Sequence, residues 1–283
     1  MSEARKKAIA DSSVEETVDW WATAISDIEP GVIRMRGYPI EQLIDGAGLV
    51  DMIWMMLRGE IPSPGQAALL EKALVSAVDH GPQAPSIASA RMAATCGLGL
   101  QGAVSTGVGL LGDVHGGAGQ QAMTMYEEIR KALAEGEQLT AAVQRTVADY
   151  RAAGRFIPGF GHRFHPRDPR RDPLLRAVAE QRERGVVDGA YLDIAIEIEK
   201  ALVTRSGKSV PMNIDGATAV IYAELGFEPE LARGLFVLSR SVGILAHAWE
   251  ESSQAQRIKG PLPPPLLAGY KGVGPRELSA ERT

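Results

Sequence analysis

Three polar residues set beside glycines are the side chains of this sequence best suited to chemistry. His115 lies in Gly-Asp-Val-His-Gly-Gly, His162 in Pro-Gly-Phe-Gly-His-Arg, and Asp215 in Asn-Ile-Asp-Gly. Glycine has no Cβ, so the backbone there can turn sharply or approach a ligand closely. Two imidazoles and a carboxylate can take a proton from one atom and give it to another. Together with nearby arginines, which bind anionic groups, they suggest carbon–carbon bond chemistry on acids.

Each candidate also has a purely structural interpretation. His115 precedes a predicted helix over residues 116–136. The helix dipole would keep it neutral and able to donate to a developing enolate oxygen, or the residue simply caps the helix. Asp215, at the start of another apolar helix, is either its N-cap or a base facing a cavity. His80, in Asp-His-Gly-Pro, either belongs to a helix C-cap or donates to an anionic substrate.

Positive charge is local in this chain. The net charge of −5 leaves no general basic field for nucleic acid. Four arginines crowd one proline-rich loop and two stand further along: Arg163, Arg167, Arg170 and Arg171, then Arg240 and Arg257. On a stiff loop beside His162, such arginines are better explained by carboxylate or phosphate binding than by a solvated face. His162 and His165 stand three apart, but the prolines around them and the lack of a Glu or Cys at ligand spacing argue against a metal site.

Helical patterns dominate and predict an all-α fold. Ser63-Pro64 and Pro85-Ser86 resemble helix starts, and further helices are predicted over residues 116–136, 140–154, 188–204, 216–225 and 230–252. Residues 31–35 are the best candidate for a strand, in a small N-terminal hairpin. The prolines of residues 156–173 predict a long loop, and the tail from Gly260 is rich in proline and glycine.

Composition is that of an ordinary soluble protein, with 45% hydrophobic and 23% charged residues. No signal peptide is expected, because residues 1–16 are polar. No membrane span is expected either, because the apolar residues 98–111 are too few and indicate a buried core helix. The lone Cys96 excludes an intrachain disulfide and favours a cytoplasmic location, and its neighbours offer no base that would make it a nucleophile.

Seven motifs follow one another in the order in which they occur in one known family. They are Arg36-Gly37-Tyr38-Pro39-Ile40, Asp79-His80-Gly81, Val114-His115-Gly116-Gly117-Ala118, Pro158-Gly159-Phe160-Gly161-His162, Asp168-Pro169-Arg170, Asn213-Ile214-Asp215-Gly216 and Ser239-Arg240-Ser241-Val242-Gly243. Over about residues 30–260 the chain therefore resembles the citrate synthase family. From Asp79 onward it looks most like the citryl-CoA lyase module that ends ATP-citrate lyase.

The resemblance implies an enzyme that uses an acyl-CoA thioester and a 2-oxo dicarboxylate, without a permanently bound cofactor. Asp215 would take the methyl proton of acetyl-CoA while His115 stabilises the enol, and His162 would protonate or hold the oxaloacetate carbonyl. It also implies binding residues: His80, Arg170, Arg240 and Arg257 for carboxylates, with Arg257 reaching the site of the other subunit, and the backbone of Pro158, Gly159, Phe160 and Gly161 for the CoA adenine.

The sequence departs from the family pattern in ways that bear on function. It is shorter than typical citrate synthases and lacks their extra N-terminal helices. His162 and Arg170 stand one residue closer than is usual, so Arg167 or Arg163 could substitute for Arg170. His115 is absent from the ATP-citrate lyase module. We predict a citryl-CoA lyase type of activity; the alternatives are a compact citrate synthase, a homologue that uses another 2-oxo acid, and an inactive CoA- or citrate-binding protein.

The same resemblance predicts the architecture. A large helical domain would comprise residues 1–115 and 223–283, and a small domain residues 116–222. The active-site cleft would lie between them and would close to exclude water. A homodimer or a dimer of dimers is expected, and the Met- and Trp-rich residues 52–57 are a candidate surface for it unless they belong to the core.

Overall fold

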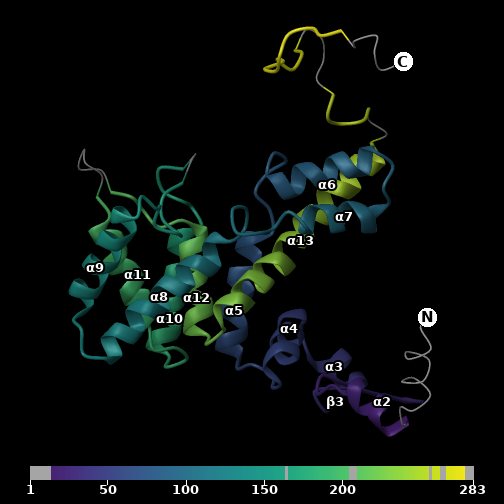
Figure 1. Cartoon of the computed structure of the whole chain (residues 1–283). Coiled ribbons are helices and arrows are strands. Elements are labelled where there is room, and N and C mark those ends of the chain that lie inside the picture. The colour runs from purple at the N-terminus through teal and green to yellow at the C-terminus, as the bar shows by residue number, and fades with distance from the viewer. Residues whose placement is uncertain (1–13, 163–164, 204–208, 255–256, 262–265, 278–283) are drawn as a thin grey trace. The chain divides into compact units, whose positions relative to one another are not determined.

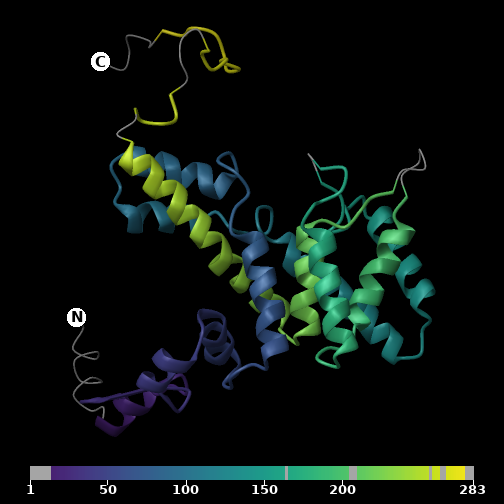
Figure 2. The same cartoon turned by 180° about the vertical axis from the view of Figure 1, so that it is seen from behind.

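Helices dominate the computed structural model, which describes the chain except residues 1–13, 163–164, 204–208, 255–256, 262–265 and 278–283 (Figures 1 and 2). The prediction of an all-α fold is confirmed. The elements in chain order are α2 (Val14–Trp20), β1 (Ser26–Glu29), β2 (Val32–Met35), β3 (Tyr38–Pro39), α3 (Ile40–Gly46), α4 (Leu49–Arg58), α5 (Pro64–Ala77), α6 (Pro85–Thr95), α7 (Leu100–Val108), α8 (Ala118–Ala134), α9 (Leu139–Ala152), α10 (Arg171–Glu183), α11 (Ala190–Ala201), α12 (Ile214–Glu224) and α13 (Pro229–Ser253).

The predicted N-terminal hairpin is present and has a third strand. β1 pairs antiparallel with β2, with Ser26 opposite Met35, and β2 pairs with β3. Arg36 adopts a positive φ of 49° in the turn between β2 and β3. Its guanidinium donates to the carbonyl oxygen of Met56 at 2.8 and 3.2 Å, which ties the turn to α4.

Contacts divide the chain into two compact units. Unit 1 comprises Met1–Val78 and Gly112–Ser239, and unit 2 comprises Asp79–Leu111 and Arg240–Thr283. The predicted domains divide the chain at other residues, and their boundaries stay a prediction.

Unit 1 is built around α12, which packs against α5, α8, α10 and α11 (Figure 1). Residues 216–223 of α12 are all buried. A helix that is apolar on every side gains hydrophobic stabilisation only when neighbours cover each face, so these four helices hold α12 firmly. The position of its first turn, which carries Asp215, is fixed as a result.

Two of the Met- and Trp-rich residues 52–57 belong to the core of unit 1. Trp54 and Met55 on α4 are buried, and the Trp54 ring meets the Phe227 ring edge-on, with the centroids 5.2 Å apart. Met52, Ile53 and Met56 are half-buried and Leu57 is exposed, so the segment is core only in part.

Unit 2 is held together by small residues and one buried ion pair. Gly107 on α7 comes so close to α6 and α13 that a Cβ would lie 2.7 Å from both the Ser86 carbonyl oxygen and the Ile244 side chain. Arg91 donates from Nε to the buried Glu251 carboxylate at 2.7 Å. The expectation that residues 98–111 form a buried core helix was wrong. On α7 only Ala103 and Gly107 are buried, because its apolar side is a narrow strip of small residues.

The longest helix, α13, has the length and composition of a membrane span. Its first part buries Ala232 and Leu235 in the core of unit 1, and its second part buries Ile244 and Ala248 in that of unit 2. Core helices of globular proteins pass the same test of length and composition. The absence of a membrane partner stays a prediction.

Four helices of the structure are missing from the sequence prediction: α2, α3, α4 and α10. The predicted loop over residues 156–173 ends early, because α10 begins at Arg171. Pro173 lies in the first turn of α10, where a proline costs no helical hydrogen bond. The remaining loop is held by Asp168, as described next.

Candidate active site

The His162 loop and the Asp215 helix are joined by backbone hydrogen bonds, although some fifty residues separate them. The N–H of Asn213 donates to the Gly159 carbonyl at 3.0 Å, and the N–H of Gly161 donates to the Pro211 carbonyl at 2.8 Å. The side-chain amide of Asn213 donates to the Gly161 carbonyl at 2.7 Å. Two of the three catalytic candidates therefore lie on segments that cannot move independently.

Glycines allow this close approach. Gly159 has a φ of +82°, and a Cβ on it would lie 2.7 Å from the Cα of Gly216. The buried Tyr126 hydroxyl donates to the Gly216 carbonyl at 3.3 Å. The glycines that were predicted to lie against CoA thus also serve to seat the loop on the start of α12.

Asn213, rather than Asp215, caps α12. Its side-chain oxygen accepts the N–H groups of Asp215 at 2.9 Å and Gly216 at 3.2 Å. The alternative interpretation of Asp215 as the N-cap was therefore wrong. Asp215 occupies the first helical turn and is half-buried, so its carboxylate can serve a role other than capping.

Asp168 fastens the loop to the same helix start. It pairs with Arg170 through two side-chain hydrogen bonds of 2.8 and 2.9 Å, and its carboxylate also accepts the N–H of Ile214 at 3.0 Å. Burial alone would raise the pKa of Asp168, but the Arg170 and backbone hydrogen bonds outweigh it and lower the pKa to about 2. Asp168 is a fixed anion next to the residues that flank Asp215.

The loop arginines have different partners. Arg167 pairs with Asp172 at 2.7 Å, on the surface. Arg171 pairs with Asp172 and with Glu199, whose other oxygen accepts the N–H of Met212. Arg163 lies outside the described residues. Among the loop arginines that the structure describes, Arg170 is the one bonded to Asp168, which in turn accepts the N–H of Ile214 at the start of α12. Arg170 has this partner although His162 and Arg170 stand one residue closer than is usual in the family.

Arg170 also opens onto a hollow of about 450 Å³ between α5 and the start of α10, lined by Glu71, Lys72, Val75, Ser76, Pro169, Arg170, Pro173 and Leu174. A guanidinium at the edge of such a hollow can reach an anionic ligand without leaving Asp168.

The ring of His162 is oriented by its own loop. Its Nδ1 accepts the backbone N–H of His165 at 3.0 Å, so in the neutral ring the proton sits on Nε2. Burial, followed by the proximity of His165, lowers the pKa of His162. His162 is therefore a neutral donor through Nε2. Among the described residues, no group of three or more His, Cys, Asp or Glu is placed to hold a metal.

His115 lies in a tight turn before α8. The N–H of Gly112 donates to the His115 carbonyl at 2.9 Å. α8 begins at Ala118 with Gly117 as its N-cap, two residues beyond His115. A Cβ on Gly119 would lie 3.7 Å from the Asp215 carbonyl oxygen, so the starts of α8 and α12 are in contact. The segments that carry His115, His162 and Asp215 thus converge on the N-terminal end of α12.

The remaining predicted residues belong to unit 2. His80 and Arg257 are exposed, whereas Arg240 is buried. Asp79, beside His80, accepts the N–H of Gly81 at 3.0 Å and lies 3.2 Å from Nε2 of His247. α5 ends at Ala77 with Val78 as its C-cap, so the interpretation of His80 as part of a helix C-cap was wrong.

Two residues of the site were not singled out by the sequence. Asn213 and Asp168 hold the site segments together, but they were named from the sequence only as members of motifs and were given no role. Asn two residues before an acidic residue at a helix start is a signal for an N-cap that could have identified Asn213. Asp168 gave no such signal, because its partners Arg170 and Ile214 meet it only in the folded chain.

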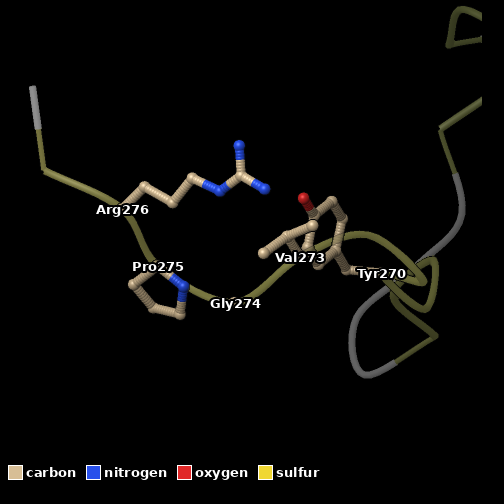
Figure 3. Close-up of a pocket in the computed structure, with 5 residues that line it drawn as sticks. All are labelled: Tyr270, Val273, Gly274, Pro275 and Arg276. Carbon is tan, nitrogen blue, oxygen red and sulfur yellow. The ribbon is translucent and has the colours of Figure 1, made fainter.

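Another hollow, of about 520 Å³, lies in the C-terminal tail and is lined by Tyr270, Val273, Gly274, Pro275 and Arg276 (Figure 3). Figure 3 shows the Tyr270 and Arg276 side chains extending toward one another over the bend. None of the predicted site residues lines it.

Comparison with known proteins identifies the family of this chain. Residues 52–261 match the family described as citrate synthase, C-terminal domain. The chain is 32% identical over 235 residues to a citrate synthase of Acidithiobacillus ferridurans, a match that covers 81% of this chain and 58% of that protein. The chain thus spans little more than half the length of the curated relatives it matches.

Solved structures show the same fold. A citryl-CoA lyase from Hydrogenobacter thermophilus is similar with a TM-score of 0.80 at 30% identity, covering 93% of this chain and 98% of that one. An ATP citrate lyase from Methanothrix soehngenii, solved with citrate and coenzyme A, is similar with a TM-score of 0.76 at 21% identity, covering 97% of this chain and 45% of that one. With its motifs on interlocked segments and a family match over most of its length, this chain belongs to the citrate synthase family.

Proposed function

We propose that this protein interconverts citryl-CoA with acetyl-CoA and oxaloacetate, as a citryl-CoA lyase. The observation that carries the proposal is the similarity to the Hydrogenobacter lyase over nearly the whole length of both chains. The matched citrate synthases, by contrast, extend well beyond the matched region.

The proposed cleavage needs one proton moved and one charge stabilised. The tertiary hydroxyl of citryl-CoA gives its proton to water, the adjacent carbon–carbon bond breaks, and the oxygen becomes the ketone of oxaloacetate. The electron pair passes to the thioester enolate. Asp215, protonated when cleavage begins, delivers the proton that turns the enolate into acetyl-CoA, and regains a proton from water. In the reverse direction Asp215 removes that proton again.

The two histidines would stabilise the oxygens on which charge builds. His115 would donate to the enolate oxygen of the thioester. His162 would donate from Nε2 to the oxygen on the carbon whose bond breaks. Nε2 carries the proton because Nδ1 accepts the N–H of His165. A single donor of this kind contributes about 10²–10³ in rate, and a placed acid or base about 10²–10⁴.

The carboxylates and CoA would be bound by the remaining residues. We assign the carboxylates to His80, Arg170, Arg240 and Arg257, and the CoA adenine to the backbone of residues 158–161. Arg170 is supported by its pairing with Asp168, whose carboxylate also accepts the N–H of Ile214 next to Asp215. We propose CoA only as a thioester substrate, with no permanently bound cofactor.

The test uses synthetic citryl-CoA with mass detection of all products. Acetyl-CoA and oxaloacetate should appear faster than free citrate. The second candidate, a compact citrate synthase, is favoured by His115, and it predicts free citrate and CoA as the main products. Binding of citryl-CoA without turnover would instead show a ligand-binding protein. A panel of other 2-oxo acids with acetyl-CoA, run in the condensing direction, tests the choice of acid.

We further propose a cytoplasmic homodimer or dimer of dimers. The support is the family membership and the single, exposed Cys96, which suits a reducing compartment. Trp54 and Met55 of residues 52–57 are core residues, and the other four residues stay a candidate surface for the dimer. Sedimentation at working concentration measures the assembly directly.

A further inference from the structure

We propose that His165 is a positioning residue for His162, holding its ring and fixing which ring nitrogen carries the proton. The effect of His165 on the cleavage rate rests on the proposed function, whereas its effect on the His162 ring does not. The inference adds to the proposed site a residue to which the motifs gave no role.

The geometry places two contacts from one residue on the same imidazole. The backbone N–H of His165 donates to Nδ1 of His162 at 3.0 Å. The two rings lie with centroids 4.5 Å apart and planes inclined at 37°. The hydrogen bond selects the Nε2–H tautomer, and the ring contact limits rotation of the His162 side chain. One contact without the other would leave either the tautomer or the direction of Nε2–H undefined.

The charged groups around His162 determine how the His165 ring affects the pKa of His162. Among the residues that the structure describes, the charged or titratable groups that act on His162 are His165, Asp168 and Arg170. Burial lowers the pKa of His162, His165 and Arg170 lower it further, and Asp168 opposes them. A cationic His165 disfavours a second cation 4.5 Å away. With His165 beside it, His162 therefore stays neutral down to a lower pH than it would without His165. Over that range it donates the single hydrogen on Nε2.

The experiment follows the His162 nitrogens by ¹⁵N NMR of histidine-labelled full-length protein, with His162→Gln used for assignment. In the wild type, Nδ1 should have the shift of an unprotonated nitrogen and Nε2 that of a protonated one. His165→Phe keeps a ring but removes its charge, so the titration midpoint of His162 should rise while the tautomer is retained. His165→Ala removes the ring as well but keeps the backbone N–H, so the midpoint should rise and the tautomer should be retained, while the His162 ring should become more mobile.

His247→Ala is the matched control, since it removes a histidine that pairs with Asp79 in unit 2. The His162 midpoint should not change in that variant. Mixed tautomers in the wild type, or an unchanged midpoint in both His165 variants, would overturn the proposal even if the variants lose activity through misfolding.

The rate profile supplies a second readout. Citryl-CoA cleavage should fall on the acid side as His162 protonates, and that acid limb should move to higher pH in His165→Phe. The rate on the neutral plateau should change by only a few fold, because Nε2 keeps its proton. The wild type could show the Nε2–H tautomer, and the His165 variants the raised midpoint, while the protein cleaves no citryl-CoA. That result would refute the proposed function but not the role of His165 in positioning His162.

Discussion

At the scale of single residues, Asp215 is separable from the helix on which it lies. Asn213 accepts the first free N–H groups of α12, so the Asp215 carboxylate is not needed to begin the helix. Asp215→Asn should lower citryl-CoA cleavage by about 10²-fold or more while CoA binding and stability are kept, since only the acid–base group is removed. Turnover and calorimetric binding of CoA measure the two effects. An unchanged rate would remove Asp215 from the mechanism.

Asn213→Ala is the complementary change. It removes the cap of α12 and the donor to the Gly161 carbonyl, so the free energy of unfolding should fall by about 1–3 kcal/mol. Urea unfolding of both variants side by side checks this. If Asp215→Asn were the less stable of the two, the division of roles between cap and carboxylate would be wrong.

At the scale of elements, the seating of the His162 loop on α12 depends on a glycine that has no room for a side chain. Gly159→Ala combines left-handed backbone strain with a Cβ 2.7 Å from Gly216, for a loss of about 2–5 kcal/mol. Gly185→Ala is the matched control, because Gly185 also has a positive φ but nothing within 4 Å of its Cβ position. It should cost only about 1–2 kcal/mol. Equal losses in urea unfolding would show that packing against α12 contributes nothing.

The hydrogen bonds of Asp168 to Arg170 and Ile214 make the free energy of unfolding of unit 1 depend on pH in a defined direction. The folded pKa of Asp168 is about 2, against an ordinary value of 3.8. Its contribution, about 2 kcal/mol, is therefore present above about pH 4 and is lost as the pH falls toward 2. In Asp168→Asn that contribution is absent, so the stability gap between wild type and variant should be widest near neutral pH and narrow on acidification.

Urea unfolding at pH 7, 5 and 3 checks this, with Asp193→Asn as control. Asp193 pairs with Arg182 where both side chains are nearly half exposed, so its loss should cost about 1 kcal/mol or less. A gap that stayed constant from pH 7 to 3 would contradict the role of Asp168.

The helices themselves were largely predictable, and their exceptions have physical causes. The Ser63 cap, the start of α6 and the extent of α8 follow from local signals that need no tertiary contact. α10 was missed because Pro173 looks like a breaker until it is known to fall in a first turn. The partners of Asp168 could not be predicted, because a pair with Arg170 and a bond to Ile214 exist only after the loop folds onto α12.

At the scale of the whole molecule, the motifs predict the family, and the predicted site residues fall in both units of the chain. His115, His162, Arg170 and Asp215 belong to unit 1, while His80, Arg240 and Arg257 belong to unit 2. Arg257 is exposed, and its role in the site of another subunit stays a prediction. Its assignment can therefore be tested only through the assembly.

Mixing two inactive variants gives that test. Asp215→Asn disables the site of its own subunit, whereas Arg257→Ala, if the arginine crosses over, disables the site of its partner. In a mixed dimer both lesions then fall on one site, and the other site is intact. Random assembly after co-expression makes about half of the dimers mixed, so about a quarter of wild-type citryl-CoA cleavage should return. Each variant alone should show almost none. If the mixture stays as inactive as its components, Arg257 acts within its own subunit or the enzyme works as a monomer, and sedimentation of the same sample distinguishes these two outcomes.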